Sequence, residues 1–122
     1  MTAISLDSQT SDLVTIDVTI SGSTARLTAA GEIDSTSAPV LRERLEPLLD
    51  GAVETFVVDL VQVTFLDSAG LCVLAAAHRR AVELDVRMHV VASSRAVIRP
   101  LQITGLWSLL EASQVEPDAG VA

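Results

Sequence analysis

The residues best suited to reversible chemistry lie in the segment Asp67-Ser68-Ala69-Gly70-Leu71. Ser68 precedes an apolar stretch that predicts a helix, and a serine there ordinarily caps the helix by accepting a backbone N–H. Asp67 could form that cap instead, which would leave the hydroxyl of Ser68 free in the first turn. A phosphate on Ser68 would then lie at the positive end of the helix dipole. We therefore interpret Ser68 as a phosphorylation site.

Gly70 and the residues after it suggest how such a phosphate would act. Glycine in a helix costs ~1 kcal/mol relative to alanine, so the missing side chain of Gly70 suggests that another backbone or a ligand approaches closely. The stretch from Leu71 to Ala77 is apolar all round, whereas a helix on a sheet needs only one apolar stripe. The surplus face is either covered by a neighbouring helix or presented to a partner. Phosphate would block that interface without unfolding the domain, by adding ~1.5 to 2 negative charges.

The composition narrows the class of partner. The chain has 122 residues, enough for one domain, with 49% apolar residues and a net charge of −8. Its eight basic residues, all arginine, form no basic block, which argues against nucleic acid and anionic membranes as partners. No apolar run approaches the ~20 residues of a membrane span, and no signal peptide is expected. With a single cysteine, the chain is expected to work in the cytoplasm.

Six further residues are expected to be structural. Cys72 is predicted to be a buried, unreactive thiol. His78 and His89 have no partner at ligand spacing, so no metal site is expected. The pair Arg79-Arg80 is interpreted as solvated charge near a helix end, and Trp107 as a core or rim residue.

The first half of the domain is predicted to form a hairpin and a helix. Residues 14–20 alternate apolar with polar side chains, and the turn Ser21-Gly22-Ser23 leads into a second strand over 24–30. Leucines at helical spacing then predict a helix, capped by Ser35 or Ser37 and ended by Asp50-Gly51.

The second half alternates strands with helices. A strand over 56–60 is expected to be buried on both faces and is followed by a loop over 61–67 and a helix over 68–83. A strand over 86–91 comes next. A helix over 95–103, capped by Ser93-Ser94, and a short last strand over 106–111 complete the domain.

This order predicts an α/β domain, with a small mixed β-sheet of four to five strands and helices packed on it. Residues 13–111 would form the domain, 1–12 a flexible leader and 112–122 a frayed tail.

Three blocks of sequence, in a fixed order, resemble one known family. They are Gly31-Glu32-Ile33-Asp34 followed by Ala38 and Leu41-Arg42; Val57-Val58-Asp59-Leu60 followed by Phe65-Leu66-Asp67-Ser68-Ala69-Gly70-Leu71; and Val97, Arg99 and Leu101 followed by Ile103-Thr104-Gly105-Leu106. The sequence is similar over residues 14–106 to the STAS domain family, and most closely to the bacterial anti-sigma factor antagonists. The resemblance implies the STAS fold.

The resemblance also implies a regulatory cycle. In that cycle other proteins act on this one, which is not itself an enzyme. An unphosphorylated antagonist binds an anti-sigma factor that is also a serine kinase, which releases a sigma factor for transcription. The kinase then phosphorylates the antagonist and drives it off, and a metal-dependent serine phosphatase restores it. Ser68 matches the acceptor, Asp67 is the adjoining acid and Asp34 matches an acidic position in the nearby loop. The expected partner-binding residues are Asp34, Asp67, Ser68, Ala69, Gly70 and Leu71, with no cofactor, metal or catalytic residue.

Three alternatives were weighed against this one. An enzyme is disfavoured because Ser68 lacks a G-x-S-x-G elbow and neither histidine sits in a recognisable base context. Asp59 could accept phosphate in a receiver domain, but Ile20-Ser21-Gly22 lacks the acidic pair that would hold magnesium. A STAS scaffold subunit of a stress-sensing complex or of a lipid transporter would share the fold, and it remains the main alternative.

Overall fold

The computed structural model describes residues 13–115. The predicted leader, 1–12, and the part of the predicted tail over 116–122 lie outside the described residues.

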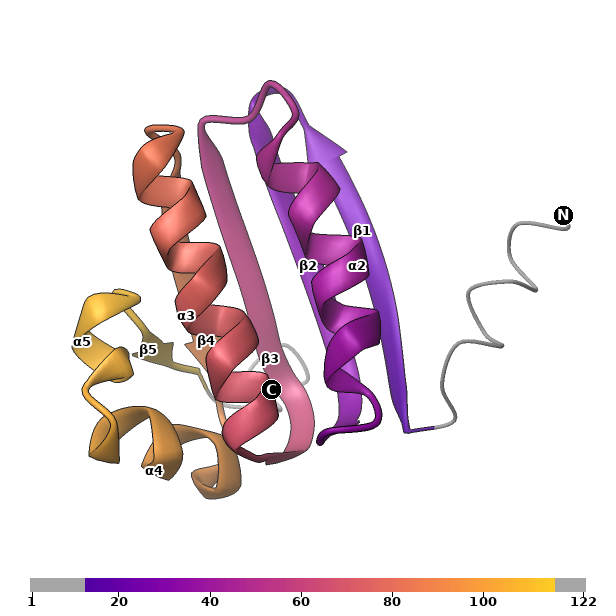
Figure 1. Ribbon diagram of the computed structural model, residues 1–122, viewed down its shortest axis with the longest axis vertical. Helices are drawn as coiled ribbons and strands as arrows, with labels where there is room; N and C mark the ends of the chain where they lie inside the picture. The colour runs from indigo at the N-terminus through magenta and orange to yellow at the C-terminus, as the bar shows by residue number, and fades with distance from the viewer. Residues whose placement is uncertain (1–12, 116–122) are drawn as a thin grey trace, which may run out of the picture.

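Five strands form one sheet in the order β1-β2-β3-β4-β5 (Figure 1). β1 is antiparallel to β2, and every other neighbouring pair is parallel. The prediction of a mixed sheet with four to five strands is confirmed. The strands are β1 (Val14–Ser21), β2 (Thr24–Ile33), β3 (Thr55–Leu66), β4 (Arg87–Ala92) and β5 (Ser113–Gln114).

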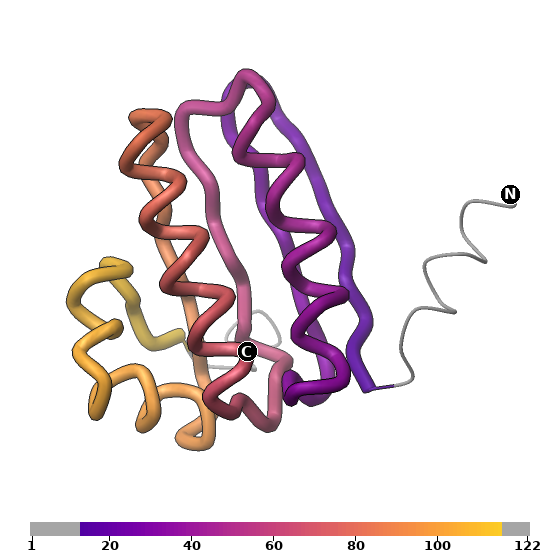
Figure 2. Tube along the Cα trace, viewed as in Figure 1, coloured from indigo at the N-terminus to yellow at the C-terminus, as the bar shows by residue number. Residues whose placement is uncertain are grey.

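Helices make the connections between the parallel strands. α2 (Ala38–Leu49) joins β2 to β3, and α3 (Ser68–Glu83) joins β3 to β4. These two helices lie side by side over the same face of the sheet (Figure 1 and Figure 2). α4 (Arg95–Ile103) packs against β3, and the short α5 (Leu106–Leu109) leads to β5. No helix within residues 13–115 has the length and apolar character needed to span a bilayer.

The sheet is covered more fully on one face than on the other. In β3, Phe56, Val58 and Leu60 are completely buried, whereas Val57 and Asp59 between them are only half-buried. Such alternation is typical of a sheet that packs its helices on one side. The prediction of a strand buried on both faces is therefore wrong.

The loop predicted over 61–67 is also wrong, because β3 continues to Leu66. Val63 pairs with Gly31, Leu66 pairs with Ile33, and the side chains of Val63 and Leu66 are buried. The register between β2 and β3 shifts at two points along the way. Such irregularities break the strict alternation by which a strand is recognised in a sequence.

The segment after Gly105 differs from its prediction as well. Gly105 has a φ of +83°, a conformation that favours glycine, and 106–109 then form a helical turn instead of a strand. The last strand is β5, which pairs with β4 beyond the predicted boundary at 111.

The other predicted elements are confirmed. The hairpin turns at Gly22, whose φ is +61°, and the helix over 68–83 has the predicted bounds. The helix over 95–103 also has its predicted bounds, and Ser94 Oγ accepts the amide of Ala96 at 3.1 Å as its cap.

Candidate partner-binding site

The two acidic sequence motifs meet at one edge of the sheet. β2 and β3 are parallel and end together, with Ile33 paired to Leu66. The amide of Asp67 donates to the carbonyl oxygen of Ile33 at 3.1 Å, which extends the ladder by one residue. Asp34 and Asp67 therefore follow neighbouring strand ends, and the carboxyl ends of parallel strands are where α/β domains commonly place their binding sites.

Asp67 caps α3, which is one of the two caps that the sequence left open. Its backbone is extended, and Oδ1 accepts the amides of Ala69 at 2.9 Å and Gly70 at 3.4 Å. Ser68 is consequently the first residue of the helix, so the interpretation of Ser68 as an ordinary N-cap is wrong. The side chain of Ser68 is exposed, and within residues 13–115 its hydroxyl forms no hydrogen bond.

Gly70 brings the first turn of α3 close to the strand ends. Gly70 is buried, and a Cβ atom there would collide with Cδ1 of Leu66 and lie 2.7 Å from Cγ2 of Ile33. The sequence suggested that this space admits another backbone or a ligand. The structure corrects that interpretation, because two core side chains of the same domain fill the space.

Asp34 holds the loop that leads into α2. Its Oδ1 accepts the amides of Thr36 at 2.8 Å and Ser37 at 3.1 Å. Ser37 occupies the N-cap position as predicted, but it makes no capping bond to the helix. Its buried hydroxyl instead donates to the carbonyl oxygen of Glu32 at 2.7 Å and accepts the amide of Asp34 at 3.0 Å. No sequence pattern indicates this linkage, since it depends on a loop conformation.

The outward face of α3 carries small side chains. Ser68, Cys72 and Ala76 are all exposed and follow one another at four-residue spacing, so they lie in one row that we call the α3 face. Leu71 and Ala75 flank this row and are half-buried. The prediction that Cys72 is buried is wrong, because the core contacts of α3 are made by other residues: Gly70, Val73, Leu74, Ala77 and Ala81.

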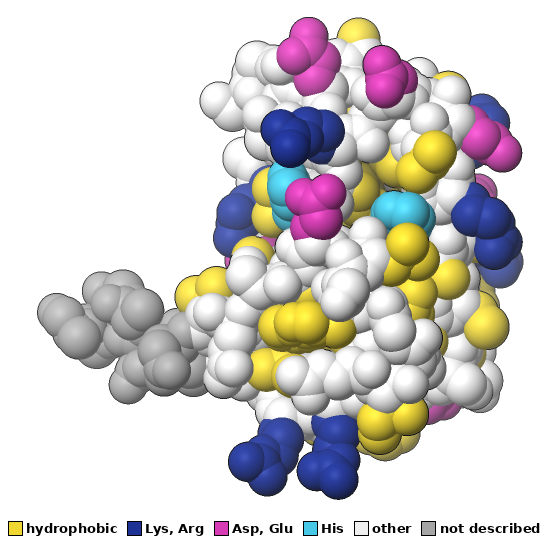
Figure 3. Space-filling model, turned by 90° about the vertical axis from the view of Figure 1, so that its left-hand side faces the viewer, with side chains coloured by type: hydrophobic (Ala, Val, Ile, Leu, Met, Phe, Trp, Pro, Cys, Tyr) yellow, Lys and Arg dark blue, Asp and Glu magenta, His cyan; other side chains and the backbone are white. Residues whose placement is uncertain are grey.

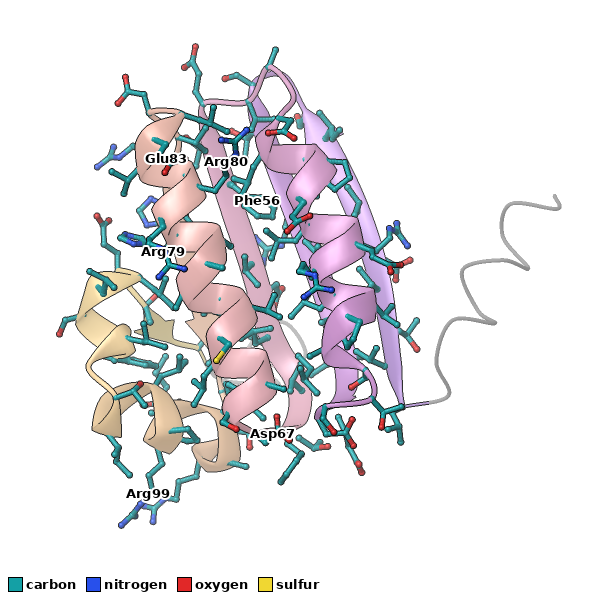
Figure 4. The ribbon with its side chains drawn as sticks, in the orientation of Figure 1. Phe56, Asp67, Arg79, Arg80, Glu83 and Arg99 are labelled. Atoms are coloured by element: carbon teal, nitrogen blue, oxygen red, sulfur yellow. The ribbon has the colours of Figure 1, made fainter. Side chains whose placement is uncertain are left out.

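A groove between α2 and α3 continues from this face. Ala76 lines it together with Leu45, Leu49 and Val73, and its volume is about 390 Å³. Arg80 lies at its end, donating to Asp50 at 3.1 Å and to Glu83 at 3.3 Å. Figure 4 shows Arg80 and Glu83 on the same part of α3, away from Asp67.

These contacts correct the interpretation of Arg80. The hydrogen bond to Asp50, followed by the one to Glu83, raises the pKa of the Arg80 guanidinium. Arg80 therefore ties the end of α3 to the residue that ends α2, whereas a merely solvated charge had been expected for both arginines. Arg79 is exposed, as expected.

Three other residues that the sequence singled out, Asp59, His89 and Trp107, make contacts within the domain. Asp59 accepts Arg26 at 2.6 Å and the amide of Val61 at 3.0 Å, which accounts for a carboxylate in this strand without phosphate chemistry. His89 Nδ1 lies 3.3 Å from Glu111 Oε1. Trp107 is half-buried against the core, which confirms its prediction.

Comparison with known proteins supports the family predicted from the sequence. A family model described as "Mlab, STAS domain" matches residues 16–111. The anti-sigma-B factor antagonist of Bacillus subtilis is 32% identical over 100 residues, which span 82% of this chain and 91% of the relative. The anti-sigma-F factor antagonist RsfB of Mycobacterium tuberculosis is 34% identical over 95 residues, or 78% of this chain and 77% of the relative.

A solved structure gives the same result. An anti-sigma factor antagonist from Mycobacterium paratuberculosis matches with a TM-score of 0.78 at 30% identity, covering 88% of this chain and 92% of the other. The chain belongs to the STAS domain family. Within that family its relatives are anti-sigma factor antagonists, as the three sequence blocks indicated.

Replacing Gly70 by alanine tests the close packing at the start of α3. We expect Gly70→Ala to lower the free energy of unfolding by about 1–2 kcal/mol, since overpacking of Ile33 and Leu66 outweighs the better helix propensity of alanine. Gly51→Ala is the matched control, because a Cβ there would lie 3.4 Å from the carbonyl oxygen of Leu48 and 3.9 Å from that of Pro47, with no closer contact. Urea unfolding measures both, and equal stability of the two variants would contradict the packing argument.

Replacing Asp67 separates its capping role from its charge. Asp67→Ala should lower the free energy of unfolding by ~1 kcal/mol, because the amides of Ala69 and Gly70 lose their acceptor. Asp67→Asn keeps an acceptor oxygen and should lose only a few tenths of a kcal/mol. Thermal and urea unfolding would show this order, and the reverse order would rule out Asp67 as the cap.

Proposed function

We propose that the protein is an anti-sigma factor antagonist whose binding to an anti-sigma factor is switched off by phosphorylation of Ser68. The observation that carries the proposal is the exposed, unbonded hydroxyl of Ser68 in the first turn of α3. A kinase needs such a hydroxyl to be accessible, and a hydroxyl used as a cap would first have to be released. The family membership supports the same role.

The hydrogen bonds of Asp67 determine what a phosphate on Ser68 would meet. The amides of Ala69 and Gly70, which could otherwise stabilise an anion at the helix start, already donate to Asp67. The adjoining carboxylate of Asp67 repels a second negative group. The phosphate therefore projects into solvent with its charge largely uncompensated by the domain. This refines the sequence-based expectation of unpaired N–H groups beside it.

The α3 face is the surface on which that charge would act. Ser68 and Cys72 lie in one row with Ala76, which also lines the groove beside α2. A row of small exposed side chains lets a partner approach the helix closely. About 1.5 to 2 added charges at one end of such an interface would oppose the desolvation that binding requires.

The proposed partners follow from this scheme. An anti-sigma factor that is also a serine kinase would bind the unphosphorylated protein and later modify it, and a serine phosphatase would reverse the modification. The protein acts as their substrate and contributes no catalytic group. We place this cycle in the bacterial cytoplasm, where sigma factors engage RNA polymerase.

Substitution of Ser68 tests the switch. With the cognate kinase and ATP, mass spectrometry should locate phosphate on Ser68, and none should be incorporated by Ser68→Ala. Ser108→Ala, which alters an exposed serine on α5, is the control and should be modified as the wild type is. Calorimetry should give Ser68→Asp at least about tenfold weaker binding to the kinase than Ser68→Ala. Tight binding that is indifferent to both substitutions would instead support the alternative of a STAS scaffold subunit.

A bulky substitution on the α3 face tests where the partner binds. Ala76→Arg should weaken binding of the anti-sigma factor by about tenfold or more, because it obstructs the row that contains Ser68. Val82→Arg is the control, since Val82 is 64% exposed on the same helix near its other end. Both changes should alter stability by less than about 0.5 kcal/mol. Equal effects of the two variants on binding would place the interface elsewhere.

A further inference from the structure

The outward face of α4 has the composition of a second docking surface. Its inward side chains Val97, Ile98 and Leu101 belong to the core. Arg95, Arg99 and Ile103 follow at four-residue spacing, so they lie in one row along the exposed side of the helix. Figure 4 shows Arg99 projecting away from the body of the domain.

An apolar hollow lies along this row. Ile103 is 75% exposed, more than any other large hydrophobic residue within 13–115. Together with Ala96 and Pro100 it lines a shallow hollow that is open to solvent and formed by this one helix, with Arg95 and Arg99 at its border. The hydroxyl of Thr104, which also lines the hollow, donates to the carbonyl oxygen of Pro100 at 2.8 Å. The surface thus combines an apolar floor with a charged border.

The two arginines have no acidic partner. Helix α4 contains no Asp or Glu, and within the described part of the chain neither Arg95 nor Arg99 forms an ion pair or hydrogen bond. Arg95 is also the first residue of α4, where the helix dipole disfavours a cation by ~0.3–1 kcal/mol.

The positive charge of Arg95 and Arg99 stands on a chain that is acidic overall. The whole chain has a net charge of −8. On the side of the molecule drawn in Figure 3, basic side chains project from the lower end, beside apolar ones. A local positive site on an acidic protein attracts acidic surfaces and orients them toward that site.

We propose that the α4 row, formed by Arg95, Arg99 and Ile103, binds a segment of a partner protein that carries two carboxylates beside an apolar side chain. The carboxylates would pair with the two guanidinium groups, and the apolar side chain would pack on the shallow apolar surface at Pro100 and Ile103. This surface shares no residue with the α3 face.

A peptide titration followed by amide chemical shifts in NMR tests the proposal. The probe is a synthetic helical peptide with two glutamates one turn apart and a leucine on the next turn. Saturable shifts should be confined to α4 and its neighbours. Arg95→Glu combined with Arg99→Glu should weaken binding at least about tenfold, and Ile103→Ser should also weaken it. Arg79→Glu, on α3, should bind as the wild type does.

The same titration can overturn the proposal. It fails if no saturable shift occurs, or if a peptide with glutamines in place of the glutamates binds equally well. It also fails if inorganic phosphate alone shifts the α4 amides as strongly, because the site would then take a small anion. Shifts in α4 that depend on protein concentration without peptide would assign the surface to a second copy of this chain. If the double glutamate variant does not fold, Arg95→Gln with Arg99→Gln replaces it.

Discussion

The hydrogen bond from the amide of Asp67 to the carbonyl of Ile33 completes the pairing of β2 with β3, and the position of Ser68 follows from it. Two parallel strands that end together place the residues after them at one edge of the sheet. Gly70 then lets α3 begin directly against the side chains of Ile33 and Leu66. A larger residue would lift the first turn of α3 and carry Ser68 with it.

The polar side chains near the ends of β2 and β3 have two kinds of role: some hold the backbone in place, and one faces solvent. The carboxylates of Asp34 and Asp67 accept backbone amides of their own loop and helix. The hydroxyl of Ser37 is buried and bonded. Of these four residues, only Ser68 is exposed with a side chain that makes no hydrogen bond within residues 13–115. A charge added there can therefore change what the surface binds while the hydrogen bonds beneath it persist.

Much of the fold and part of the candidate site could be predicted from the sequence, and each wrong prediction has a physical cause. The bounds of α3 were predicted, and Asp67 was one of the two caps that the sequence left open, because capping and helical periodicity are local properties. The length of β3 was missed because its last residues are fixed by pairing across an irregular register with β2. Cys72 was predicted to be buried because an apolar run does not show which of its faces meets the sheet. The hydrogen bond from Ser37 to Glu32 was missed because it requires a loop conformation that no periodicity encodes. The role proposed for Ser68 rests on the resemblance to a family as well as on its position.

The most direct test compares phosphorylated and unphosphorylated protein in two measurements on the same samples: amide chemical shifts in NMR and affinity for the anti-sigma kinase. Phosphate on Ser68 is expected to shift only amides near the start of α3, while the affinity for the proposed kinase falls by at least about tenfold. An affinity that does not change, or one that falls only with shifts spread through the sheet, would contradict a switch that blocks an interface and leaves the fold intact.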